Sequence, residues 1–162
     1  MVDVGAKAVT ERSAHARALV RMPLASAEAL RAATLVKGDA FAAAQIAGIL
    51  AAKQTAGLIP LAHPLPLTSV EVTFGWSSPA VLRVDAVART AAQTGVEMEA
   101  MVAASIAALT IYDMTKSLDK GSVIESIRLL EKRGGKSGTW RASDPGDASF
   151  GNDAGPLRPH DA

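Results

Sequence analysis

An aspartate and a lysine stand three residues apart near the end of a long run of small apolar residues. Asp113 and Lys116 close a stretch in which apolar residues recur at steps of three and four, which predicts a helix over residues 97–116. Residues three apart share a helix face, so this carboxylate and this ammonium are able to act as an acid/base pair. An ordinary helix salt bridge, which contributes only ~0.2–0.5 kcal/mol, fits the same spacing. The residues alone leave both interpretations open.

Three further side chains are candidates for binding an anion. His63 lies in the segment 57–67, whose three prolines exclude a regular helix or central strand and predict a stiff loop. Lys37 precedes Asp39, the predicted cap of a helix whose N-terminus adds positive potential. Lys53 falls in the last turn of that helix, where lysine is common because of the helix dipole. A purely structural role also fits His63 and Lys53.

The segment 134–138, Gly-Gly-Lys-Ser-Gly, ends like a phosphate-binding loop. That motif requires a glycine at position 130, where this chain has Leu130, and a helix after the lysine, which the sequence does not predict. A phosphate-binding loop of that kind is therefore excluded. What remains is a flexible, basic segment over residues 132–136 that is able to hold an anion loosely.

The elements that must position these residues follow a β-α-β-β-α-β order. Alternation of apolar and polar residues predicts strands, and a period near 3.6 predicts helices. The predicted strands cover residues 16–22, 68–76, 81–90 and 123–130, and the predicted helices cover residues 26–36, 39–54 and 97–116. This order is typical of the ferredoxin-like split βαβ fold, an α+β fold in which helices cover one face of an antiparallel sheet.

Apolar side chains predict which face of each long helix is buried. In the 97–116 helix the predicted core face consists of Met98, Met101, Val102, Ser105, Ile106, Leu109 and Tyr112. In the 39–54 helix it consists of Phe41, Ala42, Ile46, Ile49 and Leu50. The last predicted strand has apolar residues on both sides, so we expect the uncovered face of the sheet to pack on another subunit.

Length and composition bound the class of protein. A chain of 162 residues, 49% of them hydrophobic, predicts one domain over residues 1–140, and the polar composition of residues 141–162 predicts a disordered tail. A net charge of +1 gives no general case for nucleic-acid binding, and no apolar run reaches the ~18–20 residues of a membrane span. The chain has no cysteine and no histidine pair with metal-ligand spacing, so we expect neither a metal nor another cofactor. Since no signal peptide is recognisable, we expect a cytoplasmic protein.

Seven stretches of the chain jointly carry a resemblance to a known family. They are residues 1–4 (MVDV), 37–39 (KGD), 46–49 (IAGI) with 52–53 (AK), 58–65 (LIPLAHPL), 94–100 (TGVEMEA), 107–114 (AALTIYDM) with Lys116, and 134–138 (GGKSG). In this order they closely resemble the cyclic pyranopterin monophosphate synthase family, also called molybdenum cofactor biosynthesis protein C. The resemblance extends from the first residue to about Trp140.

The resemblance implies a ferredoxin-like subunit in a homohexamer, a trimer of dimers, with the active site at a subunit interface. It also implies a lyase reaction in molybdenum cofactor biosynthesis, in which (8S)-3′,8-cyclo-7,8-dihydroguanosine 5′-triphosphate becomes cyclic pyranopterin monophosphate and diphosphate is released. Asp113 and Lys116 match the catalytic pair of the family. The positions that match its substrate pocket are Leu61, Ala62, His63, Lys37, Lys53, Glu97, Met98 and Glu99.

The implied roles agree with this chemistry. Lys116 is expected to be the general acid/base and Asp113 to orient it. The side chains expected to offset the triphosphate charge are Lys37, Lys53 and His63.

This chain departs from the family at two places. Ala62 stands where the family usually has cysteine, which indicates either that a thiol is not essential there or that this member is impaired. Residues that the family usually carries ahead of its MVDV stretch are absent, so any contact that they make is in doubt.

Two other classes of protein compete with an enzyme. One is a ferredoxin-like regulatory module that binds a nucleotide or another anion without turnover, and the other is a purely structural oligomer. A regulatory module needs the cations but has no need of Asp113 beside Lys116. A structural oligomer leaves the whole set of residues unexplained.

Overall fold

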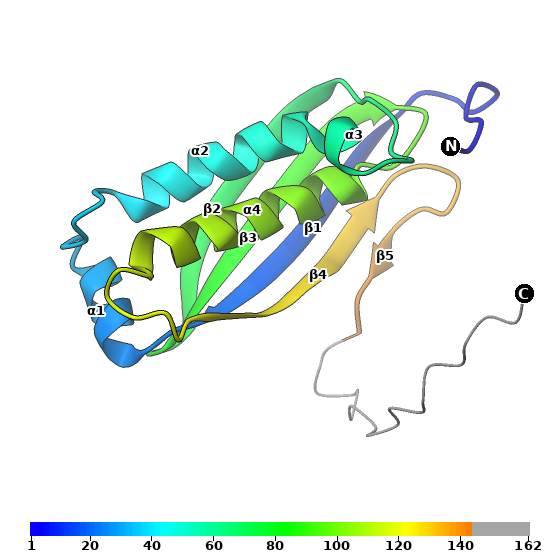
Figure 1. Cartoon of the computed structure of the whole chain (residues 1–162). Helices are drawn as coiled ribbons and strands as arrows, with labels where there is room; N and C mark the ends of the chain where they lie inside the picture. The colour runs from blue at the N-terminus through cyan, green and yellow to red at the C-terminus, as the bar shows by residue number, and fades with distance from the viewer. Residues whose placement is uncertain (144–162) are drawn as a thin grey trace, which may run out of the picture.

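The computed structural model describes residues 1–143, in which helices cover one face of a five-stranded antiparallel sheet (Figure 1). The strands lie side by side in the order β2-β3-β1-β4-β5. This arrangement confirms the predicted α+β, ferredoxin-like fold. In chain order the elements are β1 (Thr10–Arg21), α1 (Leu24–Arg31), α2 (Ala40–Lys53), α3 (Thr55–Leu58), β2 (Leu67–Ser78), β3 (Val81–Ala92), α4 (Glu97–Thr115), β4 (Val123–Arg133) and β5 (Trp140–Arg141).

Several boundaries differ from the prediction. Strand β1 begins at Thr10 rather than residue 16, and α1 ends before Ala33, which adopts a left-handed φ of 53°. The short α3 and β5 were not predicted, because elements of four and two residues show no periodicity.

The predicted tail begins inside strand β5, because Arg141, its first residue, pairs with Glu131 of β4. The rest of that tail, residues 144–162, lies outside the described residues, and its disorder stays a prediction.

Strand β1 lies at the centre of the sheet and supports the helices. It pairs with β3 on one side and with β4 on the other. Alternate residues of β1 are buried beneath the helices: Ala14, Ala16, Ala18 and Val20. Because most of these side chains are methyl groups, the helices approach the sheet closely.

The buried faces of α2 and α4 are built from small residues, contrary to the prediction. A Cβ atom added to Gly48 of α2 would lie 2.9 Å from the carbonyl oxygen of Ala103 of α4, so these helices pack almost backbone to backbone. The prediction placed the largest apolar residues inward, whereas close helix packing requires alanine and glycine at the contact. The predicted core face is correct for Val102 but wrong for five residues that are exposed: Met98 (37%), Leu109 (52%), Ile46 (60%), Leu50 (52%) and Ala42.

The uncovered face of the sheet carries a cluster of charged side chains around Asp85 of β3. Asp85 Oδ1 lies 2.7 Å from His15 Nε2 and accepts a hydrogen bond of 2.8 Å from Arg17, while Oδ2 lies 2.7 Å from Arg83 Nε. Burial by itself raises the pKa of Asp85, but hydrogen bonds from Arg17 and His15 outweigh it and hold the pKa below its usual value. This face is therefore more polar than the sequence pattern indicated, and its packing on another subunit stays a prediction.

Candidate functional site

Helices α2 and α4 run antiparallel, so the loop before α2 lies beside the last turn of α4 (Figure 1). Asp39 caps α2 as predicted, because its carboxylate accepts a 3.0 Å hydrogen bond from the backbone N–H of Ala42. Gly38 adopts a left-handed φ of 92°, which turns the chain into that cap. The turn places Lys37 next to Asp113, 76 residues further along the chain.

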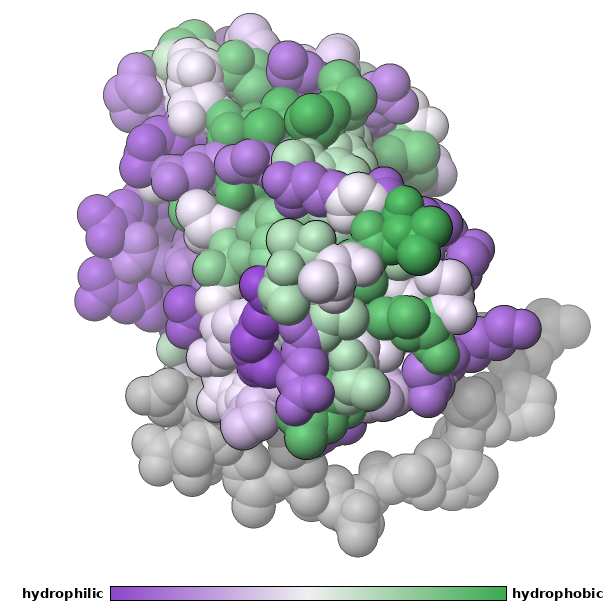
Figure 2. Space-filling view, turned by 90° about the vertical axis from the view of Figure 1, so that its left-hand side faces the viewer, coloured by the Kyte–Doolittle hydropathy of each residue, from purple (hydrophilic) through white to green (hydrophobic). Residues whose placement is uncertain are grey.

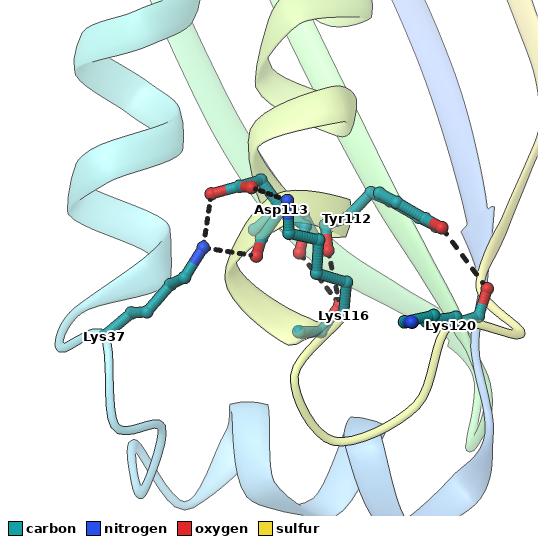
Figure 3. Close-up of polar contacts among 7 residues, drawn as sticks. Lys37, Tyr112, Asp113, Lys116 and Lys120 are labelled. Carbon is teal, nitrogen blue, oxygen red and sulfur yellow. Dashed lines mark hydrogen bonds and ion pairs between the residues drawn. The ribbon is translucent and has the colours of Figure 1, made fainter.

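Lys37, Asp113 and Lys116 form one polar group, called here the Asp113 cluster (Figure 3). Lys116 Nζ lies 2.6 Å from Asp113 Oδ1, and Lys37 Nζ lies 2.6 Å from Oδ2. Lys37 also donates a 2.9 Å hydrogen bond to the backbone carbonyl of Asp113, one of the last carbonyls of α4. The predicted pair is therefore a group of three, with one carboxylate between two ammonium groups.

The charges of the Asp113 cluster reinforce one another. Hydrogen bonds from Lys116 and from Lys37 lower the pKa of Asp113 from 3.8 to about 2. The same carboxylate raises the pKa of Lys116 above its usual value. At neutral pH the cluster consequently holds two protonated lysines and one carboxylate, and its net charge of about +1 favours binding of an anion.

One hydroxyl group bonds the segment after the cluster, and another bonds a carbonyl within the end of α4 (Figure 3). Tyr112 donates a 3.3 Å hydrogen bond to the backbone carbonyl of Lys120, and Thr115 donates one of 2.9 Å to the carbonyl of Ile111. Figure 2 looks onto this end of the molecule and shows hydrophobic residues among the polar ones. Exposed apolar side chains in the segments that flank the cluster are Val36 and Leu118.

A second site lies at the opposite end of α4, in a pocket of about 570 Å³ that we call the N-terminal pocket. It is enclosed by the start of the chain, the proline-rich loop, the segment before α4 and the first turn of α4. The lining residues are Met1, Val2, Val4, Lys7, Leu61, Ala62, His63, Leu65, Thr94, Gly95, Glu97, Met98 and Glu99. Most of the substrate-binding residues expected from the resemblance therefore come together here.

His63 is held in this pocket by the start of the chain. Its Nε2 lies 2.9 Å from the carbonyl oxygen of Val2. A carbonyl oxygen only accepts hydrogen bonds, so Nε2 carries the proton and donates it. In the neutral ring Nδ1 is then left as an acceptor for a hydrogen bond from a ligand.

Two carboxyl groups stand in the first turn of α4, and their surroundings differ. Glu99 is buried, with 3% of its surface exposed, and burial raises its pKa, to which the neighbouring charge of Glu97 adds. The Glu97 carboxylate folds over Gly95, where a Cβ atom would overlap it. The pocket therefore contains one carboxyl group, Glu99, whose proton affinity is increased at a site facing a cavity.

The structure divides the predicted site into two groups. Leu61, Ala62, His63, Met98 and Glu99 line the N-terminal pocket with Glu97, whereas Lys37 belongs to the Asp113 cluster. Lys53 is exposed in the last turn of α2 and belongs neither to the pocket lining nor to the Asp113 cluster. Fourteen residues separate Glu99 from Asp113, or ~21 Å along the helix at 1.5 Å per residue. One compact reacting centre cannot reach both groups within a single chain.

Sequence reasoning assigned no role to one wall of the pocket. This wall consists of Met1, Val2, Val4 and Lys7, and Thr94 also lines the pocket. Residues 1–4 and 94–100 were noticed as motifs, and that signal was sufficient to suggest a role for these segments. The periodicity of apolar residues could not suggest such a role, because a segment outside helices and strands has no periodic pattern.

Within residues 1–143 no group of three or more histidine, aspartate or glutamate side chains is arranged to hold a metal ion. In the same part of the chain no helix is long and apolar enough to cross a membrane.

Comparison with known proteins shows the family of the chain. The model of the MoaC family matches residues 1–135. A cyclic pyranopterin monophosphate synthase of Novosphingobium aromaticivorans is 55% identical over 144 residues, which cover 89% of this chain and 91% of the relative. A cyclic pyranopterin monophosphate synthase of Desulfitobacterium hafniense is 49% identical over 144 residues, which cover 89% of this chain and 88% of the relative. With a match of this extent over both groups of site residues, the chain belongs to the MoaC family.

Proposed function

We propose that this protein is a cyclic pyranopterin monophosphate synthase, a lyase of molybdenum cofactor biosynthesis. Its substrate is (8S)-3′,8-cyclo-7,8-dihydroguanosine 5′-triphosphate, and its products are cyclic pyranopterin monophosphate and diphosphate. The observation that carries the proposal is the identity of 49% and 55% with synthases over 89% of the chain. We also propose a cytoplasmic location, because the substrate is a nucleotide derivative.

The products define what the site has to do. A cyclic monophosphate arises from a triphosphate when a hydroxyl group of the same molecule attacks the innermost phosphorus. The hydroxyl loses its proton, a new P–O bond forms, and the P–O bond to the departing diphosphate breaks. The reaction therefore needs a proton acceptor and cations that stabilise the negative charge on diphosphate.

The Asp113 cluster fits the phosphate end of this reaction. Lys37 and Lys116 present two ammonium groups, and Asp113 holds both in place. Because its pKa is raised, Lys116 stays protonated at neutral pH and serves as a proton donor and as an electrostatic partner for phosphate oxygens. Before Lys116 acts as a base it must lose its contact with Asp113 or give up its proton to the substrate.

The N-terminal pocket fits the base end of the substrate. Glu99 has a raised pKa and faces the cavity, so it exchanges a proton more readily near neutral pH than an exposed glutamate does. His63 offers Nδ1 as a second acceptor. Ala62 leaves only a methyl group where relatives usually have a thiol, so the proposed chemistry uses no sulfur.

We further propose that each active site combines the Asp113 cluster of one chain with the N-terminal pocket of another, in a homohexamer built as a trimer of dimers. Two observations support a shared site: the ~21 Å between the two groups in one chain, and exposed apolar side chains near both. At one end these are Val36 and Leu118, and at the other they are Leu58, Leu61 and Met98. Two-fold symmetry would form each contact twice.

Incubation of the protein with the cyclised nucleotide tests the proposed function. We expect pterin product and diphosphate in equal amounts. Tight binding of the nucleotide without product would favour the regulatory module instead.

Complementation tests the shared site. Glu99→Gln and Lys116→Ala chains, each first shown to be inactive, are expressed together and the mixed oligomer is purified. In a shared site some pockets receive an intact Glu99 from one chain and an intact Lys116 from the other, so part of the activity returns. Verified mixed oligomers that stay as inactive as their parents would confine the site to one chain.

A further inference from the structure

The segment 134–138 has no part in the two groups described above, yet its backbone is unusually constrained. It forms the turn between β4 and β5, where the N–H of Gly138 donates a 3.1 Å hydrogen bond to the carbonyl of Gly135. Gly134 and Gly135 have φ angles of 94° and 71°, in the left-handed region. A Cβ atom at Gly134 would overlap the backbone carbonyl of Glu11, and one at Gly135 would overlap the guanidinium of Arg12. The glycines therefore allow this turn to lie directly on the start of β1.

Arg12, which lies under this turn, is bonded to the end of β3. Its Nε donates a 2.8 Å hydrogen bond to the carbonyl of Ala92, and its Nη2 donates one of 3.1 Å to the carbonyl of Gln93. A guanidinium is a planar fork that is able to bind two successive carbonyls, whereas a lysine ammonium is a single point of contact. The next residue after this pair, Thr94, lines the N-terminal pocket. Arg12 thus fixes the direction in which the chain leaves β3 and enters the pocket wall.

Gln93 connects the end of β3 to residues 1–7. Its side-chain amide donates a 3.2 Å hydrogen bond to the carbonyl of Gly5. Two internal bonds shape the same segment: the N–H of Gly5 donates to Asp3 Oδ1 at 2.8 Å, and the N–H of Lys7 donates to the carbonyl of Val4 at 3.0 Å. A segment outside helices and strands is mobile unless hydrogen bonds hold it. The bond from Gln93 therefore helps to keep this segment in place as a wall of the pocket.

We propose that Arg12 is a positioning residue for substrate binding, which acts through Gln93 to hold residues 1–7 as a wall of the N-terminal pocket. Gly134 and Gly135 serve this arrangement by leaving room for Arg12 and for the start of β1. The inference rests on the proposed function in that the pocket binds the synthase substrate. Arg12 itself touches no reacting atom, so its loss weakens binding without slowing chemistry.

Steady-state kinetics of the full-length Arg12→Lys variant test this role. We expect KM to rise about tenfold, the scale of one lost hydrogen bond to a charged group, while kcat stays within about twofold. Gln93→Ala is expected to raise KM about threefold, and adding it to Arg12→Lys is expected to change KM little, because both act on one path. Arg21→Lys is the matched control, since Arg21 lies at the other end of β1 and pairs with Glu125. An unchanged KM in Arg12→Lys, or independent effects of the two substitutions, would overturn the proposal.

Hydrogen exchange separates this inference from the proposed function. In Arg12→Lys we expect faster exchange of backbone amides in residues 1–7 and 93–95, with no change there in Arg21→Lys. If the wild-type protein had no synthase activity, the proposed function would fail, and the exchange data would still decide whether Arg12 holds the wall. If Arg12→Lys did not fold, Gln93→Ala would provide both measurements, because its side chain lies outside the sheet ladder. Equal exchange in wild type and Gln93→Ala would then contradict the proposal.

Discussion

At the N-terminal end of α4 a carboxyl group is buried, whereas at its C-terminal end a carboxyl group is half-exposed between two ammonium groups. Burial raises the pKa of Glu99, and hydrogen bonds from Lys116 and Lys37 lower that of Asp113 to about 2. The helix dipole would do the reverse, because it favours negative charge at the N-terminus and disfavours it at the C-terminus. One helix therefore carries two acids whose proton affinities are set against its own dipole.

This contrast shows which electrostatic effect sets the pKa of each carboxyl group. A helix dipole contributes about 0.3–1 kcal/mol, or about 0.2–0.7 pKa units. The pKa of Asp113 falls from 3.8 to about 2, a larger change than the dipole produces. Direct hydrogen bonds and burial consequently outweigh the dipole at both ends. The same protein then has a carboxyl group suited to exchanging protons and another suited to staying ionised.

The largest expected effect is at the exposed end. Lys116→Ala and Asp113→Asn are each expected to lower kcat by ~10³-fold or more, because one removes a cation from the developing diphosphate and the other removes the group that orients both lysines. Thermal unfolding should change little, since both side chains are about half exposed. Lys120→Ala, a nearby lysine whose backbone carbonyl binds Tyr112, is the control and should keep full activity. A well-folded Lys116→Ala protein with near-normal turnover would remove the catalytic assignment.

At the buried end, Glu99→Gln is expected to lower kcat about 10²-fold, because the amide fills the same space but cannot exchange a proton. Rates are measured across pH beside wild type. Since the pKa of Glu99 is raised, the acidic limb of the wild-type profile is expected above the usual glutamate value of 4.5, and the limb should be lost in the variant. Glu97→Gln serves as the control with a smaller effect. An identical pH profile in Glu99→Gln would assign proton transfer to another group.

A smaller effect concerns salt. Affinity for the triphosphate substrate is expected to fall roughly three- to tenfold between low salt and about 0.5 M, because the Debye length shortens across that range and screens the exposed lysines. The measurement is Kd by titration calorimetry at several salt concentrations. Lys37→Met should flatten the dependence, since Lys37 is one of the two cations of the Asp113 cluster. Affinity that is independent of salt would argue against phosphate binding by this cluster.

The smallest expected effects are on stability, and they have opposite pH dependence at the two ends. The folded pKa of Asp113 is depressed, so its stabilising contribution is present above about 4 and is lost as pH falls toward about 2. The folded pKa of Glu99 is raised, so its protonated form favours folding at low pH and this contribution is lost as pH rises past 4.5. Relative to wild type, Asp113→Asn should therefore become less stable, and Glu99→Gln more stable, as pH rises.

Urea unfolding at pH 3, 5 and 7 measures these differences. Asp39→Asn, which keeps an N-cap acceptor, controls for general charge effects. If both variants followed the same trend with pH, the contrast between the two ends of α4 would be wrong.

Local spacing was enough to predict the contact within the proposed catalytic pair. Asp113 and Lys116 are three residues apart, and any helix through them brings their side chains together, so the contact follows from the chain alone. The cap at Asp39 was predictable for the same reason, since it involves residues three apart. The order of strands and helices was read from periodicity, which fixes the fold class once the connections are short.

The failures concern partners far apart in the sequence. The bond between Lys37 and Asp113 joins residues 76 positions apart, and the bond between Arg12 and Gln93 joins residues 81 positions apart. Contacts between residues so far apart in sequence produce no periodic pattern from which they could be predicted. The buried faces of α2 and α4 were misjudged for a related reason, because side-chain size predicts burial only when the spacing between helices is known. Here Gly48 and Ala103 bring the helices so close that larger residues remain outside.

The sequence by itself determined the fold class, the long helices and strands, the contact between Asp113 and Lys116 and the family to which the motifs belong. Each of these rests on residues close together in the chain, where covalent geometry limits the possible arrangements. The tertiary structure alone decided that most of the proposed site residues form two groups at opposite ends of α4, that Glu99 is buried, and that residues 1–7 line one pocket. These properties depend on how distant segments pack, and packing sets both the desolvation of a carboxyl group and the partners that offset its charge.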